Sequence, residues 1–443
     1  MNRSTDLLLM GEVFVDFTLP NASAQSKLRL GGIVHAARGL WAVDQSFAAA
    51  VVCPAYLVDN ARKYLEHLGC TEFIWVADVE GSPNVMAIGD PTEIADQGYQ
   101  DILRDEKSVN FLEHSADIGK FKRCLLFPGK FDLPTVADLI SDDAEVSFDI
   151  AYDLPETKPL VAFKGRIHAL ITSTSSSLFL ENAATDVTCL INDLRQFSPT
   201  CILLKENRGG SRLFDLDSDT VEEIPALLGE TVNSVGVGDV YSAVFVSLID
   251  AGMRDAGWKA ARAATCYAQT TFPDDFKRDV GRSLTLSVDQ MHDLGGTFVP
   301  WHGRPKLQIY FAAPDFTYID RNFIDQALEA LAYHNFKVRR PVFENGELER
   351  DSTVDQMHTM FTADIALLKD CEIVFAVPLT RDPGTLVEMG WAMATDVPVI
   401  TFDPLRENTN TMVVAGSKAY SDKLDICLNG LFEAMSSIRA SRQ

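Results

Sequence analysis

The sequence predicts an α/β protein in which helices cover parallel sheets, arranged as two domains. Three observations lead to this prediction. Short apolar runs alternate with segments of helical periodicity along the whole chain, which is the pattern of repeated strand–helix–strand units. The chain has 443 residues, enough for two or three domains of roughly 100–200 residues each. A glycine- and proline-rich segment at residues 294–305 interrupts the alternation.

The expected strands are short apolar runs, as buried parallel strands require. They are Leu7–Met10, Ala48–Cys53, Cys124–Phe127, Val146–Ile150, Ala169–Thr172, Cys201–Lys205, Leu307–Ala312, Glu372–Val377 and Val397–Thr401. The expected helices carry apolar residues three and four positions apart. They are Asn60–His67, Val240–Ala251, Trp258–Thr270, Arg321–Tyr333, Thr385–Thr395 and Leu424–Ile438.

The domain boundary is placed where three glycines and two prolines fall within residues 294–305 and a fresh strand starts at Leu307. Domain boundaries usually fall in such segments. We therefore expect an N-terminal domain at residues 1–295, a linker at 296–304 and a C-terminal domain at 305–443.

Composition excludes several classes of partner. The net charge is −24 and no Lys/Arg-rich run interrupts it, which argues against a nucleic acid polymer as partner. The eight cysteines are scattered and the eight histidines show no paired spacing, so no metal site is expected. No apolar run approaches the ~20 residues that cross a bilayer, and the N-terminus lacks a signal-peptide pattern. The sequence thus predicts a soluble, cytoplasmic protein without a membrane partner.

Residues 382–391 carry the most informative motif. Gly384 and Thr385 follow an apolar strand and open a helix that contains Glu388, and Asp382 precedes Glu388 by six residues. A carboxylate in the first turns of a helix faces unpaired N–H groups, so we expect Glu388 to be ionised and available as a nucleophile. Two carboxylates at the carboxyl end of a parallel strand suit glycosidic bond chemistry. The alternative is an acidic helix start that only stabilises its own dipole.

Two segments in this half resemble the nucleoside 2-deoxyribosyltransferase family: residues 309–316, Ile-Tyr-Phe-Ala-Ala-Pro-Asp-Phe, and the run from Asp382 to Ala392. The resemblance covers almost all of residues 305–443. It implies a flavodoxin-like α/β domain that cleaves the N-glycosidic bond of a deoxynucleoside without a cofactor. Glu388 would attack the C1′ carbon to give a covalent ester, which a second base or water resolves.

The same resemblance gives roles to other residues. Asp382 would help protonate the leaving base, and Tyr310 would orient Glu388; Asp364 would contact the base, although a helix-surface carboxylate is an equal alternative. Gly384 and Thr385 would also bind the substrate. Asn410 and Met412 resemble a family segment that reaches into a neighbouring subunit's site, which implies a homo-oligomer; ordinary turn chemistry is the alternative.

The N-terminal half resembles the ribokinase-like (PfkB) sugar and nucleoside kinase family over most of residues 5–275, which implies a three-layer α/β/α domain. Three segments carry the resemblance: 11–16, with the sugar-holding Asp16 at its end; 31–40, a double-glycine turn with Gly31, Gly32 and His35 on the substrate side; and 232–241. In the last segment Gly236, Val237 and Gly238 would form an anion hole, and Asp239 would accept the proton of the attacking hydroxyl.

Several positions depart from the kinase pattern. His35 replaces a substrate-contacting Asn, Asn233 replaces an Asp, and Asn207 replaces a glycine around the nucleotide site. The element that organises magnesium should fall near residues 171–177, which read Ile-Thr-Ser-Thr-Ser-Ser-Ser. Together these changes suggest weakened ATP and magnesium handling, so the domain either phosphorylates a sugar or nucleoside with ATP and magnesium or only binds it.

Three functional hypotheses follow from these patterns. The leading one is a nucleoside- or nucleotide-processing enzyme that cleaves an N-glycosidic bond of a 2′-deoxynucleoside or its 5′-monophosphate at Glu388, with the kinase-like domain acting on a sugar or nucleoside. The second is a nucleotide sensor in which the kinase-like domain gates a nucleotide-depleting N-glycosidase. The third, a scaffold with two binding domains, conflicts with the joint presence of Asp382, Gly384, Thr385 and Glu388.

Overall fold

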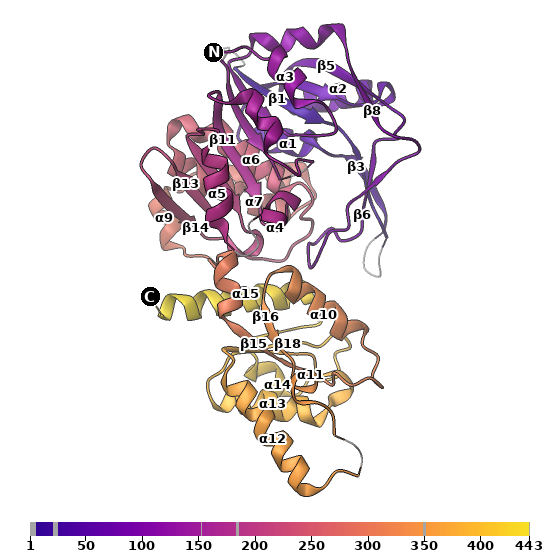
Figure 1. The fold of residues 1–443 in the computed structure, drawn as a ribbon, viewed down its shortest axis with the longest axis vertical. Helices are drawn as coiled ribbons and strands as arrows, with labels where there is room; N and C mark the ends of the chain where they lie inside the picture. Colours follow the sequence, from indigo (N-terminus) through magenta and orange to yellow (C-terminus); the bar gives the residue numbers. More distant parts are fainter. Residues whose placement is uncertain (1–5, 21–24, 152, 183–185, 349–350, 443) are drawn as a thin grey trace. The chain divides into compact units, whose positions relative to one another are not determined.

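A computed structural model describes residues 6–20, 25–151, 153–182, 186–348 and 351–442. The chain forms two compact units. The first comprises Met1–Thr92, Gln97–Leu227 and Thr231–Gly296; the second comprises Glu93–Asp96, Leu228–Glu230 and Thr297–Gln443. In Figure 1 the chain of the first unit runs from indigo to salmon, and most of the second is orange to yellow.

A large, mostly parallel sheet forms the centre of the first unit. Its strands are β1 (Leu7–Glu12), β4 (Phe47–Val52), β5 (Cys70–Glu80), β8 (Ser108–Phe111), β9 (Arg123–Leu126), β10 (Glu145–Asp149), β11 (Ile167–Ser173), β12 (Cys201–Lys205), β13 (Ser211–Asp215) and β14 (Thr220–Ile224). Within the described residues their order is β14-β13-β12-β11-β10-β9-β1-β4-β5-β8. The strands from β12 to β5 are parallel, and antiparallel strands close both edges.

Helices cover both faces of this sheet. They are α1 (Ile33–Ala42), α2 (Val58–His67), α3 (Leu133–Leu139), α4 (Ser177–Asn182), α5 (Val187–Arg195), α6 (Val237–Leu248), α7 (Met253–Ala268), α8 (Pro273–Ser283) and α9 (Val288–Asp293). In β1, Leu7 and Leu9 pack into one core with α1, α6 and α7. Leu8 and Met10 point to the opposite face and are also fully buried. The expected three-layer α/β/α arrangement is confirmed.

A second, smaller sheet in the first unit lies outside the sequence-based expectation. It consists of β2 (Val15–Thr18), β3 (Lys27–Leu30), β6 (Val85–Ile88) and β7 (Gln100–Ile102), in the order β3-β2-β6-β7 among the described residues. Its strands are short and partly exposed, and β7 reads Gln-Asp-Ile. Each of these strands has only three or four residues, too short a run for an alternation of apolar and polar side chains to identify a strand by itself.

The second unit has one parallel sheet. Its strands are β15 (Gln308–Ala312), β16 (Lys337–Arg339), β17 (Ile373–Ala376), β18 (Val399–Phe402) and β19 (Ala419–Ser421), and its helices are α10 (Asn322–Tyr333), α11 (Pro341–Asn345), α12 (Val354–Lys369), α13 (Pro383–Ala394), α14 (Thr411–Gly416) and α15 (Leu424–Ser441). Among the described residues the strand order is β16-β15-β17-β18-β19, all parallel. This is the flavodoxin-like order, as expected.

The alternation of β15 divides the core of the second unit. Ile309 and Phe311 pack with residues of α10 and α15, whereas Tyr310 faces the other side of the sheet with residues of α12 and α13. Tyr310 therefore lies where those two helices meet the sheet.

The sequence-based elements compare well with these bounds. Each of the nine expected strands and six expected helices overlaps an observed one, with ends that differ by a few residues. Residues 297–306 contribute buried side chains to the second unit, including Val299 in its core and the fully buried Arg304. No helix in the described part of the chain is long and apolar enough to span a bilayer.

Candidate functional site

The carboxylate site of the second unit lies at the point where the strand order reverses. β15 and β17 are adjacent there, with β16 on one side and β18 on the other. In open parallel sheets, ligands bind at the carboxyl ends of the strands at such a switch point. Tyr310 belongs to β15, and α13, which carries Glu388, follows β17 in the chain.

Glu388 and Tyr310 are in direct contact. The Tyr310 hydroxyl donates a hydrogen bond of 2.5 Å to Glu388 Oε1. Tyr310 is fully buried, and burial followed by the neighbouring Glu388 charge raises its pKa, so it stays a donor. The structure thus places the Tyr310 hydroxyl where the resemblance to the transferase family puts it, against the Glu388 carboxylate.

The protonation of Glu388 differs from the sequence-based expectation. Burial raises its pKa to about 7; the charges of Asp364 and Asp382 act in the same direction, and the Tyr310 hydrogen bond opposes them. Glu388 is the sixth residue of α13, beyond the first turn where the helix dipole acts most strongly. Desolvation therefore outweighs the dipole, and the carboxyl group is not firmly ionised at neutral pH.

Asp382 caps the helix that carries Glu388. Its Oδ2 accepts hydrogen bonds from the Thr385 N–H at 2.8 Å and from the Thr385 hydroxyl at 2.9 Å. A Cβ at Gly384 would lie 3.1 Å from the same oxygen, so glycine leaves room for the cap. The three predicted residues are therefore together, with Oδ2 engaged in capping. Oδ1 makes no hydrogen bond to any residue that the structure describes, so it is the oxygen that could face a ligand.

The turn before Asp382 is strained. Thr380 and Arg381 have φ values of 56° and 54°, a region that is costly for a β-branched residue such as threonine. Glu407 holds this turn: its Oε2 accepts from the Thr380 N–H at 2.8 Å, and its carbonyl accepts from Arg381 Nε at 2.9 Å. Strain of this kind persists only where the surroundings fix it, which is common next to functional residues.

Asp364 lies in α12 and faces the same site. Its carboxylate accepts a hydrogen bond of 2.8 Å from Asn345 Nδ2 in α11. Burial raises the pKa of Asp364, and its charge contributes to the raised pKa of Glu388. Asp364 and Asp382 therefore both interact with the Glu388 carboxyl group, and Asp364 also interacts with the Tyr310 hydroxyl.

Asn410 and Met412 lie elsewhere in the unit. Asn410 caps α14, where its side chain accepts from the Met412 N–H at 2.9 Å, and the Met412 side chain is exposed. Both line a groove of about 900 Å³ with residues of α13. Among the described residues, the lining of this groove includes neither Glu388 nor Tyr310.

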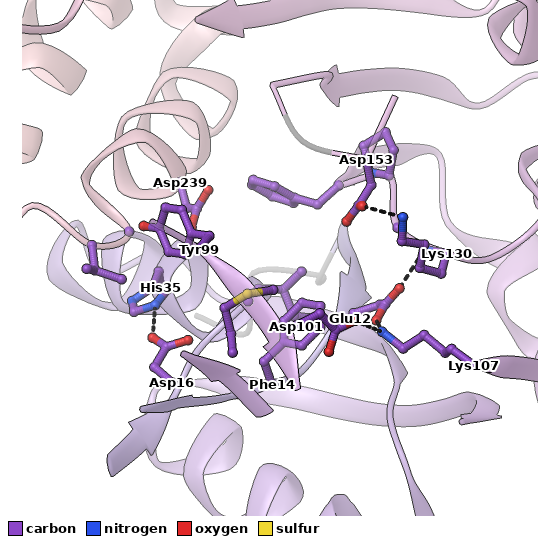
Figure 2. A pocket seen from close by; sticks show the side chains of 18 residues that line it. Glu12, Phe14, Asp16, His35, Tyr99, Asp101, Lys107, Lys130, Asp153 and Asp239 are labelled. Atoms are coloured by element: carbon purple, nitrogen blue, oxygen red, sulfur yellow. Dashed lines mark hydrogen bonds and ion pairs between the residues drawn. The ribbon is translucent and has the colours of Figure 1, made fainter. Parts of the chain in front are cut away.

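The first unit contains a separate cavity of about 350 Å³, a size that suits a small ligand. Five residues identified from the sequence line it (Figure 2): Asp16, Gly32, His35, Gly236 and Asp239. Gly31, Val237 and Gly238 are not among the lining residues. A Cβ at Gly31 would lie 2.0 Å from Asp16 Oδ1, so this glycine makes room for the Asp16 carboxylate.

The Asp16 carboxylate lines the cavity, but one of its oxygens is hydrogen-bonded to His35. His35 Nε2 lies 2.8 Å from Asp16 Oδ2, and His35 Nδ1 lies 2.8 Å from the Arg38 guanidinium. Arginine can only donate, so Nδ1 accepts and Nε2 carries the proton that is donated to Asp16. Burial lowers the pKa of His35 to about 4, so the ring is neutral.

Asp239 lies in the first turn of α6 beside the glycines. Burial raises its pKa to about 7, and the charge of Asp149 adds to that shift. Gly236 has φ 85°, and a Cβ there would lie 2.2 Å from His35 Cγ, so only glycine fits. The Val237 N–H donates to the Ser234 carbonyl at 3.0 Å. Since the first N–H groups of a helix lack intrahelical acceptors, those of Gly238 and Asp239 remain for an anion.

The residues near this helix start do not fit magnesium. The segment 171–177 provides hydroxyl groups but no carboxylate. On the neighbouring strand, Asp149 Oδ2 accepts from Lys205 Nζ at 2.7 Å and from the Ser242 hydroxyl at 2.6 Å. Magnesium in phosphoryl-transfer sites is held by one or two carboxylates. Here the buried carboxylate is paired with an ammonium group, and no group of three or more His, Cys, Asp or Glu side chains suited to a metal occurs in the described ranges.

Sequence reasoning missed several residues that line the cavity. These include Met86, Tyr99, Asp101, Lys107, Lys130 and Asp153, and also Glu12 and Phe14, which stood in a recognised motif without a role. In the other unit, the anchoring role of Glu407 was also missed. Most of the missed residues lie in the smaller sheet or in loops, where no local pattern marks them.

Comparison with known proteins gives two findings. Residues 309–427 match the family model described as nucleoside 2-deoxyribosyltransferase. No match was found among curated proteins. Among solved structures, the chain is similar to ribokinase from Giardia lamblia, with 12% identity, 64% of this chain and 99% of that one covered, and a TM-score of 0.46.

Two nucleoside kinases are similar over the same share of the chain. For the enzyme from Methanocaldococcus jannaschii the identity is 17%, the coverage 63% of this chain and 99% of that one, and the TM-score 0.43. For the enzyme from Burkholderia thailandensis, solved in complex with inosine, the identity is 12%, the coverage is 63% of this chain and 96% of that one, and the TM-score is 0.46.

Proposed function

We propose that the second unit cleaves the N-glycosidic bond of a 2′-deoxynucleoside or its 5′-monophosphate, with Glu388 as the nucleophile. The observation that carries this proposal is the buried Tyr310–Glu388 hydrogen bond at the switch point of the sheet. The family match over residues 309–427 supports a nucleoside-processing role.

The reaction would proceed in two displacements. A Glu388 carboxylate oxygen forms a bond to C1′ while the bond from C1′ to the base nitrogen breaks, and the base leaves with that electron pair. Asp382 or Asp364 would deliver a proton to the departing base. The ester carbon–oxygen bond then breaks when water or a second base attacks C1′, which regenerates the Glu388 carboxylate; the attacking group passes its proton to the aspartate that protonated the first base, which restores that acid.

The raised pKa of Glu388 fits this chemistry. Only the ionised form can attack C1′, and its negative charge stabilises the positive charge that develops on the sugar. In a buried site this stabilisation is stronger than in water. Ionising Glu388 among Asp364 and Asp382 is costly in the free enzyme, and the developing sugar cation relieves that cost in the transition state.

The first unit would bind a sugar or nucleoside, with Asp16 on the sugar hydroxyls. If it also transfers a phosphoryl group, Asp239 is the base, since its raised pKa suits proton acceptance near neutral pH. The assembly would be a homo-oligomer in which Asn410 and Met412 reach into the site of a neighbouring copy and hold the 5′ side of the sugar; the 77% exposure of Met412 leaves it available for this role.

A second candidate function is a nucleotide sensor, in which the first unit binds a ligand without turnover and gates the glycosidase. The contacts of Asp149 favour the sensor, because Lys205 and Ser242 both donate to the carboxylate that magnesium would need. ATP turnover that depends on Asp239 would contradict the sensor.

The test is chromatographic. The native protein and Glu388→Ala are incubated with each 2′-deoxynucleoside and each 5′-monophosphate, with and without a second free base. We expect base release by the native protein and none by Glu388→Ala. New nucleoside formed only with the added base establishes a transferase, and free base plus sugar establishes a hydrolase. Absence of product from every substrate, with folded protein, contradicts the proposal.

A further inference from the structure

The cavity of the first unit has a second polar group of side chains, separate from the Asp16–His35–Asp239 group. Figure 2 shows Glu12, Lys107, Lys130 and Asp153 on one side of the view and Asp16, His35 and Asp239 on the other. Apolar and aromatic side chains make up much of the remaining lining: Phe14, Ile33, Met86, Tyr99 and Phe127. The lining thus combines two polar groups with apolar and aromatic side chains, and Figure 2 places Asp101 beside Glu12 and Tyr99 beside His35.

Glu12 and Lys107 are the most buried ion pair of this second group. Their side chains are only 2% and 6% exposed, and Lys107 Nζ lies 2.7 Å from Glu12 Oε2. The two residues are 95 positions apart, on β1 and immediately before β8. Burying an ion pair generally gains little stability against an apolar pair of the same size, so a gain in stability does not explain why it lines a cavity.

The pair keeps hydrogen-bonding capacity toward the cavity. Lys107 has three protons and makes one hydrogen bond within the described chain, to Glu12; its ammonium also forms an ion pair with Asp101 at 3.6 Å and lies 4.9 Å from the centre of the Phe14 ring. Glu12 accepts from Lys107 and from the Lys130 N–H at 2.6 Å, which uses two of its roughly four acceptor positions. A ligand therefore meets a donor and an acceptor side by side.

We propose that Glu12 and Lys107 read the edge of a nucleobase, so that the ligand of this cavity is a nucleoside and not a free sugar. The ribose would lie at Asp16 and Asp239, and the flat base would pass between the apolar side chains to place an acceptor at Lys107 and a donor at Glu12. Nucleobases carry such neighbouring donors and acceptors on their edges, whereas a free pentose has no flat face to pack against the apolar and aromatic lining. This inference rests on the proposed ligand-binding role of the first unit.

The test measures hydrogen exchange of the full chain, which reports the two units separately. A Glu388→Ala background prevents turnover of the nucleoside in the second unit. Adenosine, inosine, uridine and ribose are titrated, and protection is followed in peptides that cover residues 84–110 and 233–242. We expect at least one nucleoside to protect these peptides at a concentration at least 10-fold below that needed for ribose.

The decisive variant is Glu12→Gln with Lys107→Met, which removes both charges at similar volume. It should raise the nucleoside concentration needed for protection by about 10- to 100-fold, as expected for lost hydrogen bonds to charged groups, and leave ribose unchanged. Glu12→Gln alone serves if the double variant does not fold. Lys259→Met is the matched control, because it removes one lysine charge of the first unit outside the cavity lining, where Lys259 pairs with Asp255 at 3.6 Å.

The outcomes separate the inference from its premise. Equal protection by ribose and nucleosides in the Glu388→Ala chain overturns the inference but keeps a ligand-binding first unit. Equal weakening of ribose and nucleoside by the double variant, or an effect of Lys259→Met as large as that of the double variant, also overturns it. Protection by none of the four compounds overturns both the inference and the proposed binding role.

Discussion

The Tyr310 hydroxyl should control the pH dependence of Glu388. The Tyr310→Phe variant removes the 2.5 Å hydrogen bond to Glu388 Oε1, which acts to lower the pKa of that carboxyl group from its burial-raised value of about 7. A hydrogen bond to a charged group contributes about 1.5–3 kcal/mol, and one pKa unit corresponds to about 1.4 kcal/mol. The pKa of Glu388 should therefore rise by about one to two units in the variant.

The effect on activity follows from the ionised fraction. At pH 7 about half of Glu388 is ionised in the native protein, and a rise of one to two units reduces that fraction by about 5- to 50-fold. The acidic limb of kcat/KM against pH should move upward by the same one to two units. Most of the lost activity should return at the alkaline end of the profile.

The assay is the pH profile of base release from the best 2′-deoxynucleoside. Tyr420→Phe is the matched control, because the Tyr420 hydroxyl donates to Asp403 at 2.7 Å, away from Glu388. An acidic limb that stays in place, with activity reduced equally at every pH, would refute the reasoning and leave Tyr310 a purely structural role.

Three further predictions concern stability. Because the pKa of Glu388 is raised in the folded state, the folded protein holds this proton to higher pH than the unfolded chain, so stability falls as pH rises from about 4.5 through about 7. The Tm of Glu388→Gln should therefore match that of the native protein at pH 5 and exceed it at pH 8. Equal Tm values at pH 8 would contradict the burial argument. Thr380→Gly should raise the free energy of unfolding in urea by about 0.5–1 kcal/mol, since glycine adopts the left-handed conformation without steric strain. A destabilised variant would show that the turn is not strained. Lys205→Met should destabilise the first unit by about 3–5 kcal/mol, because it leaves the buried Asp149 carboxylate without its ion-pair partner. The double variant Lys205→Met with Asp149→Asn should recover much of that loss. Calorimetry that shows no recovery would contradict the pairing argument.

The sequence predicted the layers of the fold because apolar runs mark buried parallel strands. β12 illustrates this, since Cys201–Lys205 matches the observed strand at both ends. The helix of Glu388 was predicted for a similar reason, with Pro383 and Gly384 marking its start. What failed there was the charge state of Glu388, because burial depends on tertiary packing that no local window contains.

The smaller sheet and the Glu12–Lys107 pair could not be predicted for a related reason. The strands of that sheet have only three or four residues, too few for an alternation of apolar and polar side chains to identify them. Glu12 and Lys107 come together only because β1 and the segment before β8 lie close in the folded chain, and a single sequence does not report contacts over 95 positions. The cap of Asp382, by contrast, involves Thr385 three residues later and is a local signal that sequence patterns do contain.

The central claim is that Glu388 forms a covalent bond to the sugar. The most direct measurement is peptide mass analysis after rapid acid quenching of the native protein with 2′-deoxynucleoside. The account predicts a mass increase of one deoxyribosyl group (or deoxyribosyl phosphate, with a monophosphate) on the peptide that contains Glu388, and none in Glu388→Gln. Undiminished base release by Glu388→Gln, or turnover with the adduct on another residue, would contradict it.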